Sequence, residues 1–458
     1  MQRIQRVAIV LLGLVFILSG LSEAKVKLVY VNNVTDVTAN VEQQLIEMFM
    51  EENPDIEVEY RNAPITPDQL LLWAAGGMAP DVYMVHSHTV NELVGMGLLT
   101  PLDKFVKDDP EVDLYDLFPE GIEEFSVGGV LYGMPYEYHM VAALFYNADV
   151  IAESGLPTPP DHWEWEDFLR YAAKLVKTDG DQVTRWAFYS GHPLNFMHSW
   201  GGKMVDDWRN PTDTLIDSPE AIAGYEAYVD LVHRRLSPPT ANYVNEFLGE
   251  TTAMVLSGLW GSYAFKDANF QWDITLPPVG PNGGRGYEFV SRALGISTTT
   301  QYPEEAYRLL KFLAYDERAL KIRALSVASE GVQGEMPARI SVARGEAFVE
   351  NDLGPKNKML MLMVADYVYR MPRHPEARWV FGVYKVSRCA TWPSVPQSKS
   401  ARSYSQQNRA QRPTAPGKPS LGPSLRPQVH STKVGWFPDL RWITVPVPCG
   451  NTGYPPKF

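Results

Sequence analysis

Apolar and polar positions between residues 26 and 60 follow a pattern that predicts a strand, a helix and a second strand. Residues 26–31 form a short apolar run typical of a strand. Residues 41–52 place their apolar positions on one side of a helix, and the turn at residues 53–55 separates this helix from a strand at residues 56–60. This order predicts a βαβ unit and a parallel sheet.

A second apolar run continues the pattern and brings polar side chains to its end. Residues 82–85 form a short apolar strand, which delivers His86 and Ser87 into a loop. A helix predicted for residues 89–96 follows and stops at Gly97, because glycine is the usual residue just past a helix C-terminus. In open α/β sheets ligands bind at the carboxyl ends of strands, so His86 and Ser87 are predicted to lie near a ligand site.

Four motifs make the chain resemble the extracellular solute-binding proteins, family 1, of bacterial ABC importers. The first joins Pro80-Asp81-Val82 to the helix that ends in Gly97-Leu-Leu-Thr-Pro-Leu-Asp103. The others are a Tyr-Gly-x-Pro segment, a Tyr-Asn pair followed by Gly-Leu and Trp, and an element with Ala-Met and Gly-x-Trp. They occupy Tyr132 to Pro135, Tyr146-Asn147 with Gly155, Leu156 and Trp163, and Gly249 to Trp260. The resemblance covers residues 25–345.

The resemblance implies an α/β, two-lobed periplasmic binding protein class II fold, in which each lobe is a mostly parallel sheet flanked by helices and a disordered C-terminal tail follows. It also implies crossings between the lobes near residues 136–140 and 290–293. A ligand that binds the closed state more tightly would then close the lobes by hinge movement. The implied parts are lobe one at residues 25–138 and 293–340, and lobe two at residues 139–292 and, incompletely, 341–382.

The N-terminus reads as a secretory signal peptide, residues 1–24. Arg3 and Arg6 precede an apolar run at residues 7–18, and Ser22-Glu23-Ala24 fits a small-x-small cleavage site. An uncleaved anchor is the alternative. Bacterial lipoproteins carry a cysteine where this chain has Leu21. The sequence therefore predicts a free periplasmic protein.

The C-terminal tail, residues 383–458, differs in composition from the rest. It holds eleven Lys or Arg against one acid, 12 of the 36 prolines and both cysteines, Cys389 and Cys449. Such a segment cannot bury a core and is predicted to be disordered. It is either a basic interaction arm or a frame-changed replacement of the family's last helices, and the abrupt change favours the second. A disulfide in a disordered tail would stabilise nothing folded.

The remaining body is acidic. It has 30 of the 41 basic residues and 53 of the 54 acidic ones. Nucleic acids and anionic membranes need cationic patches on their partners, so neither is expected as a partner.

Tryptophan is dense in the predicted second lobe. Seven of the twelve lie between residues 163 and 272, and an aromatic face beside carboxylates and amides suits a carbohydrate. Most of these indoles are expected in the core. Trp200, beside two glycines, and Trp260, in the fourth motif, are predicted to contact the ligand.

Polar candidates for the ligand site lie at predicted strand ends and crossings. Each of them could instead be an ordinary solvated loop residue. Arg292 could pair with a carboxylate or phosphate of the ligand, or with a carboxylate of the protein. The predicted polar and aromatic residues of lobe one and the crossings are Asn32, Asp36, His86, Ser87, Tyr136, Glu137, Tyr138 and Arg292.

No metal or other cofactor is predicted. His86 and His88 could face one side of a strand, but a zinc site needs three or four ligands and no further Cys or His is near in sequence. The chain also has no Gly-x-Ser-x-Gly elbow, His-Glu-x-x-His pair or phosphate-binding loop.

The sequence predicts the periplasmic substrate-binding component of an ABC importer, a monomer that passes a sugar or oligosaccharide to membrane permease subunits. Glycerol phosphate and a polyamine stay open as ligands. An exported carbohydrate-active enzyme is the alternative class, although Glu123-Glu124 and Asp206-Asp207 are adjacent and point apart. A binding protein that serves a chemoreceptor is a third possibility.

Overall fold

The computed structural model describes residues 25–34, 36–209, 211–239, 242–370, 372, 431–434 and 443–446. The predicted signal peptide and the two cysteines lie outside the described residues. The chain divides into two compact units, residues 1–377 and 378–458. In the second unit, β15 (Ser431–Val434) pairs antiparallel with β16 (Ile443–Pro446). The remaining residues of the tail, for which disorder was predicted, lie outside the described residues.

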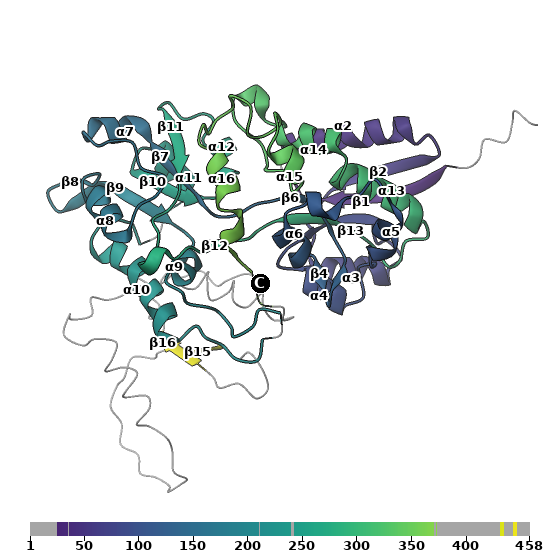
Figure 1. Cartoon of the computed structure of the whole chain (residues 1–458), viewed down its shortest axis with the longest axis horizontal. Helices are drawn as coiled ribbons and strands as arrows, with labels where there is room; N and C mark the ends of the chain where they lie inside the picture. The colour runs from purple at the N-terminus through teal and green to yellow at the C-terminus, as the bar shows by residue number, and fades with distance from the viewer. Residues whose placement is uncertain are drawn as a thin grey trace, which may run out of the picture. The chain divides into compact units, whose positions relative to one another are not determined.

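Lobe one is built on a five-stranded sheet in the order β2-β1-β3-β13-β6 (Figure 1). The strands are β1 (Val26–Asn32), β2 (Ile56–Asn62), β3 (Val82–His86), β6 (Met134–Glu137) and β13 (Arg292–Ile296), with a small hairpin of β4 (Ser126–Val127) and β5 (Val130–Leu131). The helices are α2 (Asp36–Glu52), α3 (Pro67–Ala75), α4 (Val90–Gly95), α5 (Asp103–Asp108), α6 (Pro119–Glu124), α13 (Pro303–Ala314), α14 (Glu317–Ala324) and α15 (Ile340–Ala343), with short 3₁₀ turns η1 (Leu114–Asp116) and η3 (Ala328–Glu330).

Lobe two has a second five-stranded sheet, in the order β11-β7-β10-β9-β8 (Figure 1). Its strands are β7 (Ala143–Asn147), β8 (Lys177–Asp179), β9 (Gln182–Ser190), β10 (Thr252–Ser257) and β11 (Trp272–Thr275), beside a strand pair of β12 (Tyr287–Glu288) and β14 (Val368–Tyr369). Its helices are α7 (Ala148–Glu153), α8 (Trp165–Ala173), α9 (Pro193–Ser199), α10 (Pro219–His233), α11 (Tyr243–Leu248), α12 (Gly261–Ala264) and α16 (Met359–Met363), with 3₁₀ turns η2 (Pro281–Gly283) and η4 (Ala365–Tyr367). The two-lobed α/β fold is confirmed.

Both sheets are mixed. In lobe one β2, β1 and β3 are parallel, but β13 runs antiparallel to both β3 and β6. In lobe two the neighbours β9 and β10 pair parallel, and the other three neighbouring pairs are antiparallel. The physical reason in lobe one is connectivity: β13 enters the sheet on the chain's return from lobe two, at the edge where β3 ends.

Three segments join the lobes. Residues 138–142 lead from β6 to β7, residues 289–291 lead from β12 to β13, and residues 344–358 lead from α15 to α16. The first two run side by side, because Met140 bridges Phe289 and the amide of Val141 donates to the carbonyl of Glu288 at 2.9 Å. The predicted lobe boundary at residue 340 falls at the first residue of α15, which packs against α14 of lobe one.

Strand β7 contributes side chains to two separate apolar clusters. Its side chains alternate between faces, as the two-residue period of a strand requires. Ala143 and Phe145 belong to an apolar cluster that reaches through lobe one, whereas Leu144 and Tyr146 belong to a second cluster under α8. No helix among the described residues is long and apolar enough to cross a membrane.

Candidate functional site

Three charged or titratable side chains form a row across the sheet of lobe one, where the chain crosses to lobe two. Arg292 begins β13 and stands opposite His86 at the end of β3 and opposite Glu137 at the end of β6. Residues directly opposite in antiparallel strands lie on the same face. The Arg292 Nη1 lies 3.2 Å from Glu137 Oε2. The strand register therefore positions this row.

A fourth and a fifth side chain complete the cluster. His139 Nε2 lies 3.2 Å from Glu137 Oε2, on the same face of the crossing segment two residues further on. Glu335 arrives from a distant part of the chain and lies 3.6 Å from Arg292. It is placed there because residues 336–338 run along β6, with the Tyr138 amide donating to the Met336 carbonyl at 2.9 Å.

The two carboxyl groups of this cluster have opposite pKa shifts. Burial alone would raise the pKa of Glu137, but the Arg292 charge and hydrogen bonds from Glu335 and His139 hold it well below its usual value. Burial and the negative charge of Glu137 raise the pKa of Glu335 well above its usual value. The cluster thus combines a Glu137 carboxylate that accepts hydrogen bonds with a Glu335 carboxyl group that keeps its proton to higher pH than an ordinary glutamate.

The neighbouring histidines are neutral. Burial, with contributions from His88 and Arg292, lowers the pKa of His86 to about 3. Burial also lowers the pKa of His88, and the two rings stack at 5.0 Å between centroids. Neutral imidazoles beside a paired Arg292 and Glu137 leave the row with no net charge.

Trp260 extends the cluster from lobe two. It precedes α12, its side chain is 39% exposed, and its ring meets the His139 ring edge-on at 5.8 Å. The indole lies over Gly258, where an added Cβ would stand 1.9 Å from the ring. Glycine at residue 258 is therefore required for the position of this indole.

Two buried polar atoms of the cluster have no hydrogen-bond partner among the residues that the structure describes. They are Nδ1 of His139 and Oε2 of Glu335. Buried polar groups are nearly always satisfied, so these atoms are suited to a polar ligand.

The same cluster is the one group among the described residues that could hold a metal ion. Ligand atoms of Glu137, His139 and Glu335 lie within 4.8 Å of one another. The guanidinium of Arg292 already contacts both carboxyl groups, and its positive charge opposes a cation there. Hydrogen bonding to a neutral ligand suits the site better than metal binding.

Of the predicted site residues, His86, Glu137, Trp260 and Arg292 come together in this cluster. The sequence left open whether Arg292 pairs with a ligand anion or with a protein carboxylate. In the structure it pairs with the carboxyl groups of Glu137 and Glu335.

Five other predicted residues lie outside this cluster and make contacts within the protein. Asn32 donates to the Tyr30 hydroxyl at 2.9 Å and lies 3.5 Å from the Tyr136 hydroxyl, all inside lobe one. Tyr138 points to the other face of the crossing and donates to the Ala365 carbonyl at 2.9 Å. Ser87 is 2% exposed, and Trp200 packs edge-on against Trp165 at 5.1 Å. The Asp36 side chain lies outside the described residues.

His139 and Glu335 were missed by the sequence reasoning. The alternation of a strand could have found His139, because it shares a face with Glu137. No motif or spacing indicated Glu335.

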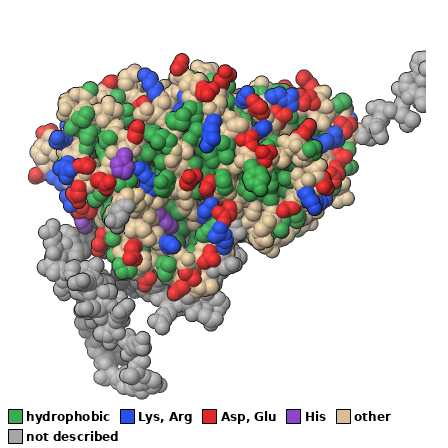
Figure 2. Space-filling model, in the orientation of Figure 1, with side chains coloured by type: hydrophobic (Ala, Val, Ile, Leu, Met, Phe, Trp, Pro, Cys, Tyr) green, Lys and Arg blue, Asp and Glu red, His purple; other side chains and the backbone are tan. Residues whose placement is uncertain are grey.

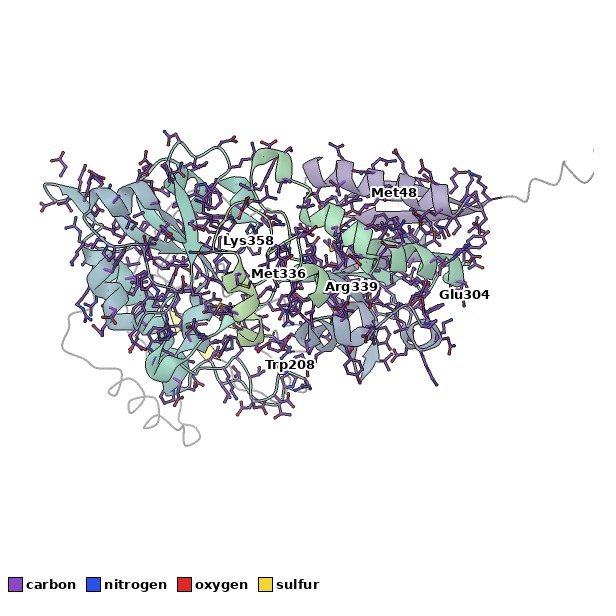
Figure 3. The ribbon with its side chains drawn as sticks, turned by 45° about the horizontal axis from the view of Figure 1, so that its top comes forward. Met48, Trp208, Glu304, Met336, Arg339 and Lys358 are labelled. Atoms are coloured by element: carbon purple, nitrogen blue, oxygen red, sulfur yellow. The ribbon has the colours of Figure 1, made fainter. Side chains whose placement is uncertain are left out.

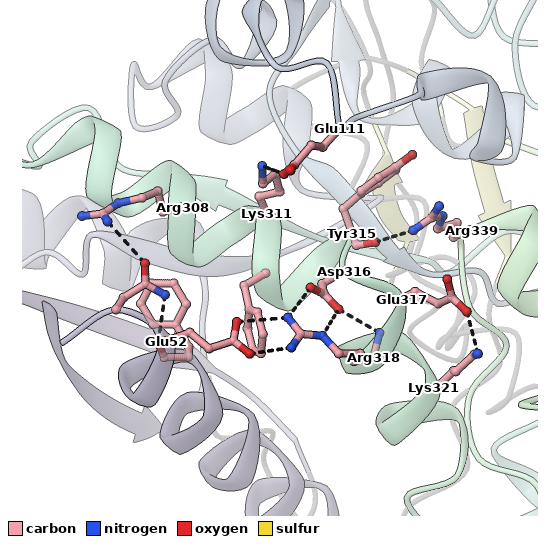
Figure 4. Close-up of a pocket in the computed structure, with 13 residues that line it drawn as sticks. Glu52, Glu111, Arg308, Lys311, Tyr315, Asp316, Glu317, Arg318, Lys321 and Arg339 are labelled. Carbon is pink, nitrogen blue, oxygen red and sulfur yellow. Dashed lines mark hydrogen bonds and ion pairs between the residues drawn. The ribbon is translucent and has the colours of Figure 1, made fainter. Parts of the chain in front are cut away.

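A cavity of about 790 Å³ lies elsewhere on lobe one, between α2, α13 and α14 (Figure 4). Its cations face protein carboxylates: Lys311 lies 2.7 Å from Glu111, and Arg318 contacts Glu52 and Asp316. The charged side chains that line the cavity are thus paired within the protein. None of the predicted site residues lines it.

Two lobes on separate sheets, joined by neighbouring crossing strands with a polar cluster and an exposed indole at their junction, define a two-lobed solute-binding protein. A model of the family described as bacterial extracellular solute-binding protein matches residues 33–318, more than half of the chain. The chain belongs to this family, as the resemblance predicted.

Relatives with described ligands are similar over most of their length. The maltotriose-binding protein of Pyrococcus abyssi is 23% identical over 370 residues, which cover 78% of this chain and 75% of the relative. The galactooligosaccharide-binding protein of Bacillus subtilis is 27% identical over 320 residues, 66% of this chain and 71% of the relative.

Solved structures share the fold. An ABC substrate-binding protein from Listeria monocytogenes in complex with cycloalternan has a TM-score of 0.68 at 22% identity, covering 80% of this chain and 93% of its own. The sugar-binding protein MalE from Xanthomonas citri has a TM-score of 0.67 at 22% identity, covering 83% and 95%.

Proposed function

We propose that this protein is the substrate-binding component of an ABC importer, which captures an uncharged sugar or oligosaccharide between its lobes and delivers it to a membrane permease. The observation that carries the proposal is the exposed indole of Trp260 beside the buried cluster of Glu137, His139, Glu335 and Arg292.

The chemistry of this junction suits a sugar ring. The apolar C–H face of a pyranose packs on an indole, while its hydroxyl groups need both donors and acceptors. His139 Nδ1 and Glu335 Oε2 are buried polar atoms with no hydrogen-bond partner in the described part of the chain. Both atoms are acceptors, because His139 Nε2 and the Glu335 carboxyl group already hydrogen-bond to Glu137, so two hydroxyl groups of one sugar could donate to them.

The ion pairs within the cluster argue against a phosphate and against a polyamine as the ligand. A phosphate needs a free cation, but Arg292 is already paired with Glu137 and Glu335. A polyamine needs free carboxylates, but Glu137 already contacts Arg292 and His139, and the raised pKa of Glu335 disfavours its carboxylate form. The oligosaccharides in the names of the relatives from Pyrococcus abyssi and Bacillus subtilis agree with a neutral ligand.

The paired carboxyl groups do not favour the enzyme alternative. Glycosidases hold their two carboxyl groups about 5–9.5 Å apart, so that a substrate bond or a water fits between them. Glu137 and Glu335 are instead hydrogen-bonded to each other. Export to the periplasm, a permease partner and a monomeric state are part of the same proposal.

Calorimetric titration and thermal shift of the full chain test the proposal with maltotriose, a galactooligosaccharide, glycerol phosphate and a polyamine. We expect binding heat and a raised melting temperature with an oligosaccharide and neither with the two charged ligands. Replacing Trp260 by Ala should weaken the sugar at least about tenfold, a loss of about 1.4 kcal/mol. Binding of glycerol phosphate alone would contradict a neutral ligand, and release of hydrolysed sugar would show an enzyme.

A further inference from the structure

A cluster of charged and aromatic side chains links the two lobes away from the ligand site. Glu123, on α6 of lobe one, forms an ion pair with Arg209 of lobe two. The same carboxylate lies 2.9 Å from Nη2 of Arg370, and the Nε of Arg370 lies 3.9 Å from Glu124. One carboxylate of lobe one thus receives two guanidinium groups.

Both arginines belong to lobe two. Arg370 follows β14, which pairs with β12, and Tyr369 in that strand stacks on His198 of α9 at 3.8 Å. Arg209 lies in the loop between α9 and α10, and its amide donates to Asp207 at 2.8 Å.

Trp208 joins the two guanidinium groups. Its ring centroid is 4.7 Å from Cζ of Arg209 and 5.1 Å from Cζ of Arg370. Figure 3 places Trp208 at the side of lobe two that adjoins lobe one. Cation–π contacts of this kind hold planar guanidinium groups in a fixed orientation.

The loop that carries Trp208 and Arg209 is braced against its own backbone. The Asp206 carboxylate accepts hydrogen bonds from the amides of Thr212 and Asp213 at 3.0 and 3.1 Å, and Val205 bridges Thr214. A hydrogen bond from the Thr212 hydroxyl, together with these amide bonds, lowers the pKa of Asp206 well below its usual value. These bonds therefore fix the conformation of the loop. Lys, Arg, Asp and Glu side chains are scattered over the face of the two lobes that Figure 2 shows.

Glu123 lies on the opposite face of the crossing from the ligand site. Along the crossing strand Glu137 and His139 share one face, where His139 meets Trp260. Tyr138 points to the other face. A methyl group added to Gly121, on the same helix as Glu123, would lie 3.9 Å from the Tyr138 ring.

We propose that Glu123, Arg209, Arg370 and Trp208 form a clasp that holds the lobes open at the ligand site. When two bodies turn about a hinge, contacts on one face close as contacts on the other face separate. Closure of the lobes over Trp260 therefore has to pull Arg209 and Arg370 away from Glu123. The clasp sets how readily the lobes close, and hence the apparent ligand affinity, a role that rests on the function proposed above.

Small-angle X-ray scattering of the full chain without ligand tests the clasp. Glu123→Lys replaces two attractions by two repulsions, so we expect a smaller radius of gyration and a closed-to-open ratio raised about threefold or more. The double variant E123K/R209E restores one attraction with the signs exchanged, and its radius should return towards that of the original chain. Glu123→Gln, which keeps the side-chain shape, should give a smaller shift of the same sign and serves if E123K does not fold.

Glu153→Lys is the matched control. Glu153 also pairs with two cations, Lys177 and Arg185, but all three lie in lobe two. Reversing the charge of Glu153 should leave the radius of gyration unchanged. An unchanged or larger radius in both Glu123 variants would overturn the clasp, whereas absence of sugar binding in the original chain would overturn the proposed function and leave the scattering result intact.

Discussion

Arg323 and Glu42 form an ion pair in the interior of lobe one, with side chains 3% and 0% exposed and Nη2 3.0 Å from Oε2. The Arg323 guanidinium also lies 4.7 Å from the centroid of the Tyr136 ring. The pair links α2 and α14 beneath the strand that leads to the ligand site.

We expect Arg323→Met to lower the free energy of unfolding by about 3–5 kcal/mol, because it leaves the Glu42 carboxylate buried without its cation. The double variant E42L/R323M removes both charges and should recover much of this loss. Urea unfolding followed by circular dichroism measures both. A single variant as stable as the original chain would contradict this role of the pair.

Substitution of Gly258 by Ala should weaken sugar binding at least about tenfold. The added methyl group would stand 1.9 Å from the Trp260 ring and force the indole to move. Gly95→Ala is the control, because nothing lies within 4 Å of a Cβ there. Titration calorimetry with the sugar that binds the original chain compares the two, and equal affinities would mean that the indole position is not required.

The raised pKa of Glu335 predicts a pH-dependent difference in stability between the original chain and Glu335→Gln. A glutamate in the unfolded chain has its ordinary pKa of 4.5 and loses its proton above that pH, whereas Glu335 in the folded chain keeps it. Glu335 thus stabilises the fold below pH 4.5, and this stabilisation is lost as pH rises towards its folded pKa, at up to about 1.4 kcal/mol per pH unit.

Glutamine cannot titrate, so the stability of the Glu335→Gln variant relative to the original chain should increase with pH above 4.5. Urea unfolding at a series of pH values measures this difference. A difference that stays constant with pH would show that Glu335 titrates normally.

The lowered pKa of His86 predicts the opposite trend. Between pH 6.5 and about 3 the unfolded chain binds a proton at this imidazole and the folded chain does not. Stability should therefore fall as pH drops through this window, and His86→Asn should remove that part of the slope. The chemical shift of the His86 ring measured by NMR should show no titration near pH 6.5, and a normal titration would refute the prediction.

The two-lobed fold could be predicted because its determinants are local. The turn at residues 53–55 and the strand that ends at His86 are readable from periodicity and turn chemistry. Helix α2 begins at Asp36, five residues before the predicted start, because helix ends are weakly marked in sequence.

The site could be predicted only in part, because it depends on strand register and on distant contacts. Glu137 and Arg292 were found at the crossings, but their pairing follows from the register of β6 and β13. Trp200 was chosen for its neighbouring glycines, yet Gly201 has φ of +84° at the end of α9 and a Cβ on Gly202 would stand 2.5 Å from Ala221. Those glycines serve helix termination and helix packing.

The order of strands along the chain has a consequence for assembly. All five strands of the lobe two sheet lie between Ala143 and Thr275, inside the sequence of lobe one. The sheet of lobe one is incomplete until β13, Arg292–Ile296, takes its place between β3 and β6. A chain that emerges from its N-terminus therefore has every strand of the lobe two sheet before β13, the strand that joins β6 to the rest of the lobe one sheet. Until β13 is made, the facing edges of β3 and β6 stay open to mispairing.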